Sequence, residues 1–471
     1  MNIALIVVGA YMALIIGIAV FSNRRMANKD SAGYLLAGQR LPWYLVAVMV
    51  TGLAVGGAST VGVAEQAYTA GLSAGWYTLA WSCAAVVFGL LISNKVCRYN
   101  MITVSGLIKK VFGKTDGMIA ILMQVLLMFG INATQIVAGG AILSALMPEV
   151  FNMAGGMVVS TLVYILTSCF GGYLGASITN CINVVVIYAG LITSALFSIN
   201  HFGGWTAIRL ALPSGAHWFD CFSGVGPAVI AGWIITMVMT APPNQMLFQA
   251  SAAAKDERQA RKGFLAAALL MGPTGVLAAL IGVMTASQFP GLENAALALP
   301  TLAMAFPPVL GGVILSGLWA ADVSTAIGLL LGISTIVTKD VAAAYLVRDM
   351  SEKRQVIFSK IILVLTAGLG LLVALKVESI LGFLMQLMTL YSPYALLILA
   401  ILYCPGLIRK SSCSVTVFAG VVLMVAWAVF PKIRVVESVI YLAVPMCLAA
   451  MLLCRVFDRR KINIREILQE K

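Results

Sequence analysis

Charge is scarce in this chain. Asp, Glu, Lys and Arg make up only 10% of its 471 residues, whereas 61% are hydrophobic and the mean hydropathy is +1.01. Soluble globular proteins carry about a quarter of their residues as charges, so this composition excludes that class. It predicts an all-α polytopic membrane protein, because a helix satisfies its own backbone hydrogen bonds in lipid.

Clustered metal ligands and paired cysteines are missing as well. The two histidines, His201 and His217, lie on one predicted loop, and the nine cysteines are scattered without a CxxC spacing. A zinc site and a disulfide framework are therefore not supported. The net charge of +13 forms no single basic patch, which argues against a nucleic-acid partner. No constellation of nucleophile, base and metal ligand is present, so we expect neither an enzyme nor a bound cofactor.

Apolar runs divide the chain into about thirteen predicted transmembrane helices. The runs cover residues 3–22, 42–70, 75–94, 117–147, 155–173, 176–200, 224–250, 264–286, 308–337, 358–377, 380–403, 414–431 and 437–456. Residues 1–22 lack a basic segment ahead of the apolar run, so we expect a retained span rather than a signal peptide.

The basic residues predict the orientation of these spans. With the N-terminus outside, the inner loops and tail hold 26 of the 30 Lys and Arg residues. Inner loops of membrane proteins carry such an excess of positive charge. We therefore predict the N-terminus outside and the C-terminus inside, in the plasma membrane (the inner membrane of the cell).

Two spans are interrupted at their centres. Glycines weaken a helix at Gly52, Gly56 and Gly57, and Pro242 and Pro243 remove two backbone donors from the other span. Each interrupted span opens a block of five, and an odd number of spans inserts the second block upside down. This pattern predicts a five-plus-five inverted repeat with its site at the midplane.

The predicted organisation has five parts. They are an extra N-terminal helix with a cytoplasmic loop at 1–41, the first repeat at 42–200, an extracellular loop at 201–223, the second repeat at 224–403, and two C-terminal helices with a cytoplasmic tail at 404–471.

One acid stands alone in an apolar run. Asp322 is the only charged residue between Glu293 and Lys339. A carboxylate near the bilayer centre costs about 2.5–3.5 kcal/mol, so a partner must compensate it. Ser324 and Thr325 follow it, and clustered oxygen ligands suit a small hard cation. Hydroxyls in membrane helices also bond carbonyls one turn earlier, which is the alternative interpretation of these two residues.

Several stretches resemble the sodium:solute symporter family, which has the inverted-repeat fold of the bacterial leucine transporter. The resemblance runs from about Ala32 to Asp340. The stretches that carry it are Gly38–Trp43, Gln249–Lys255, Ala320–Thr325 and Ser334–Asp340.

The resemblance implies a sodium site and a solute site. The sodium ligands would be the carbonyls of Gly52, Val55 and Ala321 and the hydroxyls of Ser324 and Thr325, with Asp322 beside them. Positions 321, 324 and 325 share one helix face, which agrees with this assignment. Between the broken helices, the candidate solute-binding residues are Ser59, Thr60, Val63, Asn244, Gln245, Gln124 and Asn132, and Glu65 is a candidate gate residue.

This chain departs from the family pattern at two acidic positions. Some members carry an Asp where this chain has Ala54, and others carry a Thr-Asp pair where this chain has Thr179 and Asn180, followed by Asn183. The missing carboxylate argues against a second sodium, so we expect one sodium per cycle. No aromatic residue adjoins Asn244 in the second break, so an aromatic cage for a quaternary ammonium is not evident.

The expected function is sodium-coupled import of a small polar organic solute by alternating access. The partners would be that solute, sodium and membrane lipid, and the protein would be a monomer or a weak oligomer. Two alternatives stay open, a proton-coupled symporter that uses Asp322 and a membrane sensor domain. The identity of the solute, and whether Asp322 contacts it, are also open.

Overall fold

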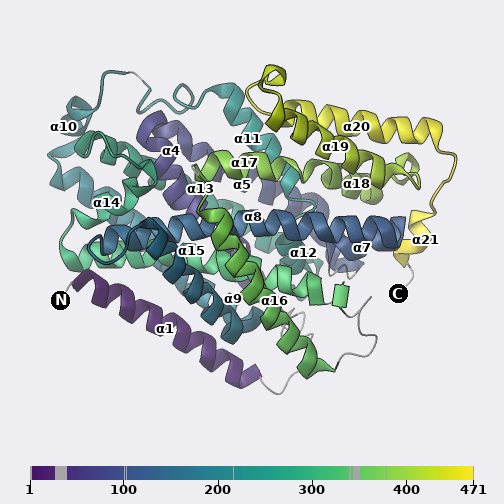
Figure 1. Ribbon diagram of the computed structural model, residues 1–471, viewed down its shortest axis with the longest axis horizontal. Coiled ribbons are helices and arrows are strands. Elements are labelled where there is room, and N and C mark those ends of the chain that lie inside the picture. Colours follow the sequence, from purple (N-terminus) through teal and green to yellow (C-terminus); the bar gives the residue numbers. More distant parts are fainter. Residues whose placement is uncertain are drawn as a thin grey trace.

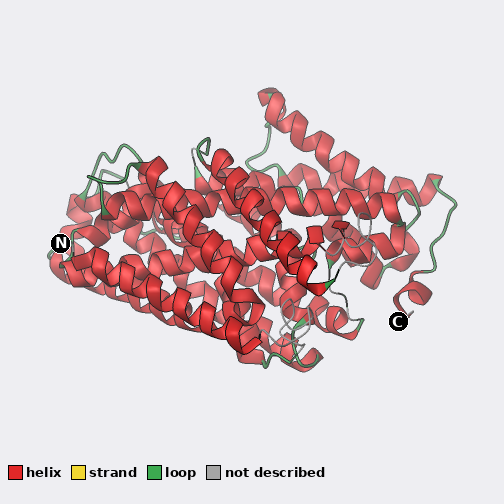
Figure 2. Cartoon of the chain, turned by 60° about the horizontal axis from the view of Figure 1, so that its bottom comes forward, coloured by secondary structure: helices red, strands yellow, loops and turns green. Residues whose placement is uncertain are grey.

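The computed structural model describes residues 3–26, 40–99, 101, 103–215, 217–338, 341–342, 351–377 and 379–469, and these form helices joined by loops (Figures 1 and 2). The helices are α1 (Ile3–Met26), α3 (Trp43–Ala54), α4 (Val63–Ala70), α5 (Trp76–Val87), α6 (Ser93–Arg98), α7 (Val104–Phe112), α8 (Lys114–Leu146), α9 (Met153–His201), α10 (Gly204–Ala211), α11 (Pro227–Thr240), α12 (Gln245–Ala252), α13 (Glu257–Gln288), α14 (Ala298–Met304), α15 (Pro308–Ile336), α16 (Glu352–Ala374), α17 (Ile380–Thr389), α18 (Ser392–Tyr403), α19 (Ser412–Val429), α20 (Ile440–Phe457) and α21 (Ile464–Gln469).

The predicted spans fall on these helices, singly or in pairs. Within the described ranges, eight helical segments are long and apolar enough to cross a membrane alone. The pair α17 and α18, bent by 44° at a short break, raises this number to nine. Other predicted spans consist of two short helices that meet at an interruption, as α3 and α4 do. The all-helical fold is thus confirmed, and the count of thirteen stays a prediction.

α9 accounts for two predicted spans although its 49 residues are continuous. Tyr164 contacts Asp322 of α15, and Asn183 donates a hydrogen bond to the Ala320 carbonyl on the same helix at 3.3 Å. A straight helix would separate positions 164 and 183 by about 28 Å, whereas positions 320 and 322 are about 3 Å apart along α15. α9 therefore bends back, and both halves pack against the centre of α15.

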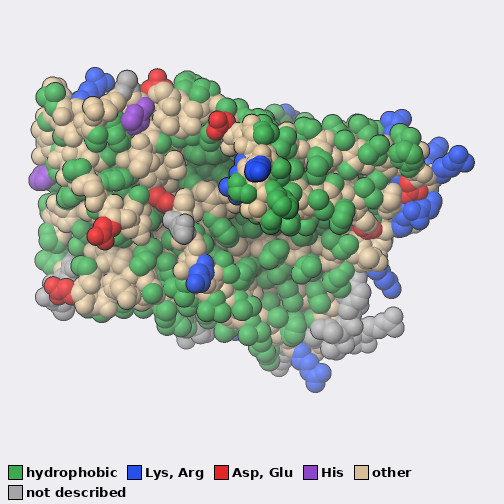
Figure 3. Space-filling model, turned by 45° about the horizontal axis from the view of Figure 1, so that its top comes forward, with side chains coloured by type: hydrophobic (Ala, Val, Ile, Leu, Met, Phe, Trp, Pro, Cys, Tyr) green, Lys and Arg blue, Asp and Glu red, His purple; other side chains and the backbone are tan. Residues whose placement is uncertain are grey.

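Basic side chains gather at one end of the molecule. Figure 3 shows many Lys and Arg residues at the end near α21, a largely hydrophobic middle, and the histidines at the opposite end. This is the distribution that the predicted orientation requires. Lys29, Lys339, Arg348 and Lys471, which also enter that prediction, lie outside the described residues.

α15 is the most enclosed of the spanning helices. Within its most apolar 18 residues, 89% are buried, against 22% for α16. It packs on α9, α8, α1 and α16. Asp322 on this helix is therefore surrounded by protein rather than by lipid.

α5 and α13 meet through two facing glycines. A Cβ atom built on Gly275 would lie 2.6 Å from the Gly75 carbonyl oxygen and 2.6 Å from the Thr78 Cβ. Small residues allow helices in lipid to approach this closely. We expect Gly275→Ala to lower the free energy of unfolding by about 1–3 kcal/mol, because the α5 backbone must move away.

The matched control is Gly368→Ala on α16, where an added Cβ meets nothing within 4 Å. This change should leave stability unaltered or raise it slightly, because alanine favours the helix more than glycine does. The measurement is thermal unfolding of both purified variants in one detergent. Equal melting temperatures for the two variants would show that the glycine contact does not limit packing.

Candidate functional site

The first broken helix is interrupted at Val55 and Gly56. α3 ends at Ala54, and a π-helical turn over Ala58–Gly62 leads into α4. The Ser59 hydroxyl donates to the Ala54 carbonyl, and the Thr60 hydroxyl donates to the Gly56 carbonyl at 3.1 Å. These hydroxyls satisfy carbonyls that the interruption releases, because buried backbone acceptors need a partner.

The second broken helix is interrupted at the two prolines. α11 ends at Thr240 and α12 begins at Gln245. The Asn244 side-chain oxygen accepts hydrogen bonds from the amides of Met246 and Leu247 at 3.0 and 3.3 Å and so caps α12. Gln124 of α8 donates to the Pro243 carbonyl at 2.8 Å. Both interruptions inferred from Gly and Pro are thus present.

α3 and α15 meet through a cluster of oxygens. The Thr325 hydroxyl lies 2.9 Å from the Gly52 carbonyl oxygen and 3.2 Å from that of Ala321. The Ser324 hydroxyl lies 3.2 and 2.8 Å from the same two oxygens. Four of the five predicted sodium ligands are therefore adjacent. The fifth, Val55, lies in the break, where its amide still bonds the Thr51 carbonyl at 2.8 Å.

This oxygen cluster fits a small cation. The two hydroxyls bond the Ala321 carbonyl one turn earlier, as the alternative interpretation expects, and they also reach across to Gly52 of α3. Their role as sodium ligands stays a prediction. Neutral oxygens from two helices can ligate a hard monovalent ion, and they leave its charge to be balanced nearby.

Asp322 lies beside this cluster, but its carboxylate points toward Gly57, Gly139 and Tyr164. It is fully buried, its Oδ2 contacts the Tyr164 hydroxyl, and its Oδ1 has no hydrogen-bond partner within the described residues. A Cβ built on Gly57 would lie 2.7 Å from Oδ1, and one built on Gly139 would lie 2.7 Å from Oδ2. The carboxylate thus points at the first break and at α8. No ion pair of the described residues involves Asp322.

Amides stand where some family members carry an acid. A Cβ built on Gly52 would lie 2.6 Å from the Asn180 Nδ2, so this amide adjoins a predicted sodium ligand. Asn183 bonds the Ala320 carbonyl and accepts a hydrogen bond from the Tyr11 hydroxyl at 2.6 Å. Neither amide supplies a negative charge.

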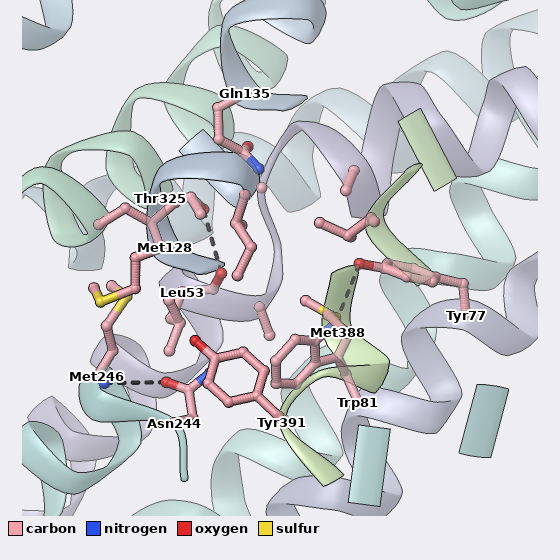
Figure 4. Close-up of a pocket in the computed structure, with 16 residues that line it drawn as sticks. Leu53, Tyr77, Trp81, Met128, Gln135, Asn244, Met246, Thr325, Met388 and Tyr391 are labelled. Atoms are coloured by element: carbon pink, nitrogen blue, oxygen red, sulfur yellow. Dashed lines mark hydrogen bonds between the residues drawn. The ribbon is translucent and has the colours of Figure 1, made fainter. Parts of the chain in front are cut away.

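A central cavity of about 30 Å³ lies between the two breaks. Its walls come from both broken helices, from α5, α8, α15 and α17, and from the turn between α17 and α18 (Figure 4). Its side chains include Leu53, Tyr77, Trp81, Met128, Gln135, Asn244, Met246, Thr325, Met388 and Tyr391. No charged residue lines it among those the structure describes. This space holds one or two waters, so its walls must separate before an organic solute can enter.

Of the candidate solute residues, Asn244 lines this cavity. Gln245 accepts a hydrogen bond from the Val104 amide at 3.0 Å, and Gln124 braces the second break as described. Asn132 is fully buried, and its amide lies 3.1 Å from a Cβ built on Gly370 of α16. Ser59, Thr60 and Val63 are buried within the first broken helix. In this conformation Ser59, Thr60, Gln124 and Gln245 bond backbone groups, whereas neither amide atom of Asn132 has a hydrogen-bond partner within the described residues.

The aromatic walls of the cavity come from helices outside the breaks. Tyr77 and Trp81 lie one turn apart on α5, with the Trp81 Nε1 donating to the Tyr77 hydroxyl at 3.3 Å, and Tyr391 lies between α17 and α18 (Figure 4). The expectation that aromatic residues are absent considered only the second break and therefore missed these rings. A spacing of four residues on one apolar helix was the available signal.

Glu65 connects the first broken helix to α17. Its carboxylate lies close to the Ile380 amide and the Ser379 hydroxyl, at the first turn of α17. The N-terminus of a helix attracts negative charge. The contact joins α4 to α17 at the ends predicted to face outward, where a gate residue would lie.

Comparisons with known proteins give a consistent result. The model of the sodium:solute symporter family matches residues 34–410. A sodium/glucose cotransporter of Vibrio parahaemolyticus is 23% identical, over 91% of this chain and 85% of the relative. An osmoregulated proline transporter of Bacillus subtilis is also 23% identical, over 80% of this chain and 79% of the relative. The solved structure of a Na+-coupled sialic acid symporter has a TM-score of 0.79 at 16% identity and covers 97% of this chain and 98% of its own.

Proposed function

Because the chain belongs to the sodium:solute symporter family, we propose that it imports a small organic solute with one sodium per cycle by alternating access. Members of this family are secondary transporters and not enzymes, and the protein is a multi-pass transporter of the plasma membrane. The observation that carries the sodium assignment is the oxygen cluster of Gly52, Ala321, Ser324 and Thr325.

Sodium would act by holding α3 against α15. Gly52 lies two residues before Ala54, and Leu53 and Ala54 line the central cavity. Ligation of the Gly52 carbonyl would therefore fix one wall of the solute site. Asp322, whose Oδ1 lies beside Gly57, would balance the charge of the ion. One charge that crosses a potential of about 100 mV supplies roughly 2.3 kcal/mol for solute accumulation.

The central cavity favours a solute with few polar groups. Its polar side chains are Gln135, Asn244, Thr325 and the tyrosine hydroxyls, and the rest are rings, thioethers and aliphatic groups. Burying a hydroxyl without a partner costs about 1–3 kcal/mol, so a sugar would bind poorly here. Glucose and proline are named for two relatives that match equally well, so neither solute is assigned to this chain.

The test is thermal unfolding of the purified protein in NaCl against equal concentrations of KCl. Sodium at about 100 times its Kd should stabilise the folded state by about 2.7 kcal/mol, a rise of a few degrees in Tm. Uptake into proteoliposomes should then follow the sodium gradient. Equal Tm in both salts, together with uptake that ignores sodium, would refute the proposal.

A further inference from the structure

A second cavity, of about 350 Å³, lies at the ends of the helices predicted to face outward. We call it the outer crevice. It is formed by the start of α11, the first two turns of α17, Gln66 of α4 and the connection between α19 and α20. Its volume falls in the range of small-molecule sites, about 300–1,000 Å³.

The outer crevice and the central cavity are both lined by α17. On α17, Leu381 and Met385 line the crevice, whereas Leu384 and Met388 line the central cavity. These four positions lie on one helix face, so the two cavities follow each other along α17.

A pair of rings also separates the two cavities. Trp233 lines the crevice and Tyr77 lines the central cavity, and their rings meet edge to face with centroids 6.3 Å apart. The crevice therefore lies between the predicted outer face and the central cavity. Side chains, including the rings of Trp233 and Tyr77, separate it from the central cavity.

The lining of the crevice combines an acid with two indole side chains. Trp233 and Trp427 are buried, and Glu437 is exposed at the rim. No Lys or Arg is among the lining residues that the structure describes, and Glu437 takes part in neither of the two ion pairs found there. A carboxylate beside indole faces attracts organic cations, through charge and through the negative face of each ring.

The central cavity has compatible chemistry. It presents the rings of Tyr77, Trp81 and Tyr391, and its lining lacks any described Lys or Arg that could hold a carboxylate. The positive end of α12 faces this space, but the Asn244 oxygen already occupies its first amides. Three methionines, which change rotamer easily, can adapt the wall to an alkyl group.

We propose that the outer crevice is a waiting site for a small organic ammonium solute, which rests against Trp233, Trp427 and Glu437 before it passes to the central cavity. This inference rests on the proposed function and adds the substrate class to it. Passage requires the Trp233–Tyr77 contact to open, because these rings close the route.

The experiment measures equilibrium binding of radiolabelled choline to the purified full-length protein in NaCl. Its neutral carbon isostere, 3,3-dimethylbutan-1-ol, is the competitor, since it has the same shape without the charge. We expect two choline molecules per protein and little displacement by the isostere. Glu437→Gln should weaken one of the two sites by roughly two- to fivefold, as expected for the loss of a charge contact at an exposed carboxylate.

The matched control is Glu293→Gln, which removes an exposed acid from the same predicted outer side but does not line the crevice. It should bind choline as the parent does. A single choline per protein, equal binding by Glu437→Gln and the parent, or equal competition by the isostere would each overturn the inference. Failure of the proposed function gives a different result, because the parent would then show no sodium-dependent Tm shift or uptake whatever its choline binding.

Discussion

Replacing Thr325 by valine should raise the sodium concentration for half-maximal uptake by about 10- to 100-fold. The substitution keeps the shape of the side chain but removes the oxygen that lies 2.9 Å from the Gly52 carbonyl. A neutral group that contacts a charge contributes about 1.5–3 kcal/mol, and each 1.4 kcal/mol is a factor of ten in affinity. The measurement is the sodium dependence of initial uptake rates in proteoliposomes.

Thr335→Val provides the control on the same helix. Thr335 is also buried on α15, but its hydroxyl bonds only the Leu331 carbonyl one turn earlier, at 2.7 Å. Sodium dependence should stay at the parent value in this variant. An equal loss of sodium affinity in both variants would mean that removing any buried hydroxyl from α15 weakens sodium binding. The effect of Thr325→Val would then give no support for Thr325 as a ligand.

Asp322→Asn should weaken sodium binding by at least tenfold while the protein stays folded. Thr325 and Asp322 contact the adjacent residues Gly56 and Gly57, so the carboxylate lies close to the predicted ion. A nearby unit charge contributes on the order of 2 kcal/mol or more at an effective dielectric constant of about 20. The Asn side chain can still accept a hydrogen bond from Tyr164. Sodium-dependent shifts in Tm give the affinity.

A second buried acid supplies the comparison for this variant. Asp116 at the start of α8 accepts a hydrogen bond from the Ser414 hydroxyl at 2.6 Å, far along the chain from the oxygen cluster. Asp116→Asn should lower stability without changing the sodium affinity. If Asp322→Asn bound sodium as tightly as the parent, the charge-balancing role of Asp322 would be wrong.

The sequence predicted the features that depend on local backbone chemistry. Pro242 and Pro243 remove hydrogen-bond donors wherever they stand, so their effect on the helix is independent of the rest of the fold. The spacing of Ala321, Ser324 and Thr325 places them on one helix face for the same reason. The contact of this face with Gly52 could be predicted only from the family resemblance, because no local rule pairs residues about 270 positions apart.

The solute site was harder to predict, because a polar side chain near a broken helix can either bind a solute or bond the backbone groups that the break releases. An amide in an apolar span suggests a ligand, but Gln124 and Gln245 bond the backbone at Pro243 and Val104. Tyr77 and Tyr391 line the cavity, but the sequence does not reveal this, because an aromatic residue in an apolar segment usually packs in the hydrophobic core. Only the tertiary fold brings these rings, from α5 and from the turn between α17 and α18, to one cavity.

The hydroxyls of Ser324 and Thr325 have a consequence for the half of the cycle in which the carrier returns without cargo. A hydroxyl carries one proton and two lone pairs, so it can turn a lone pair to an ion or its proton to a carbonyl. When sodium leaves, the two hydroxyls can donate to Gly52 and Ala321, as their distances show. A carboxylate in their place could only accept, and would leave these buried carbonyls facing a negative charge. Under the proposed function, the same four atoms would stay hydrogen-bonded or ligated both with and without the ion, so the return of the empty carrier would leave no buried carbonyl without a partner.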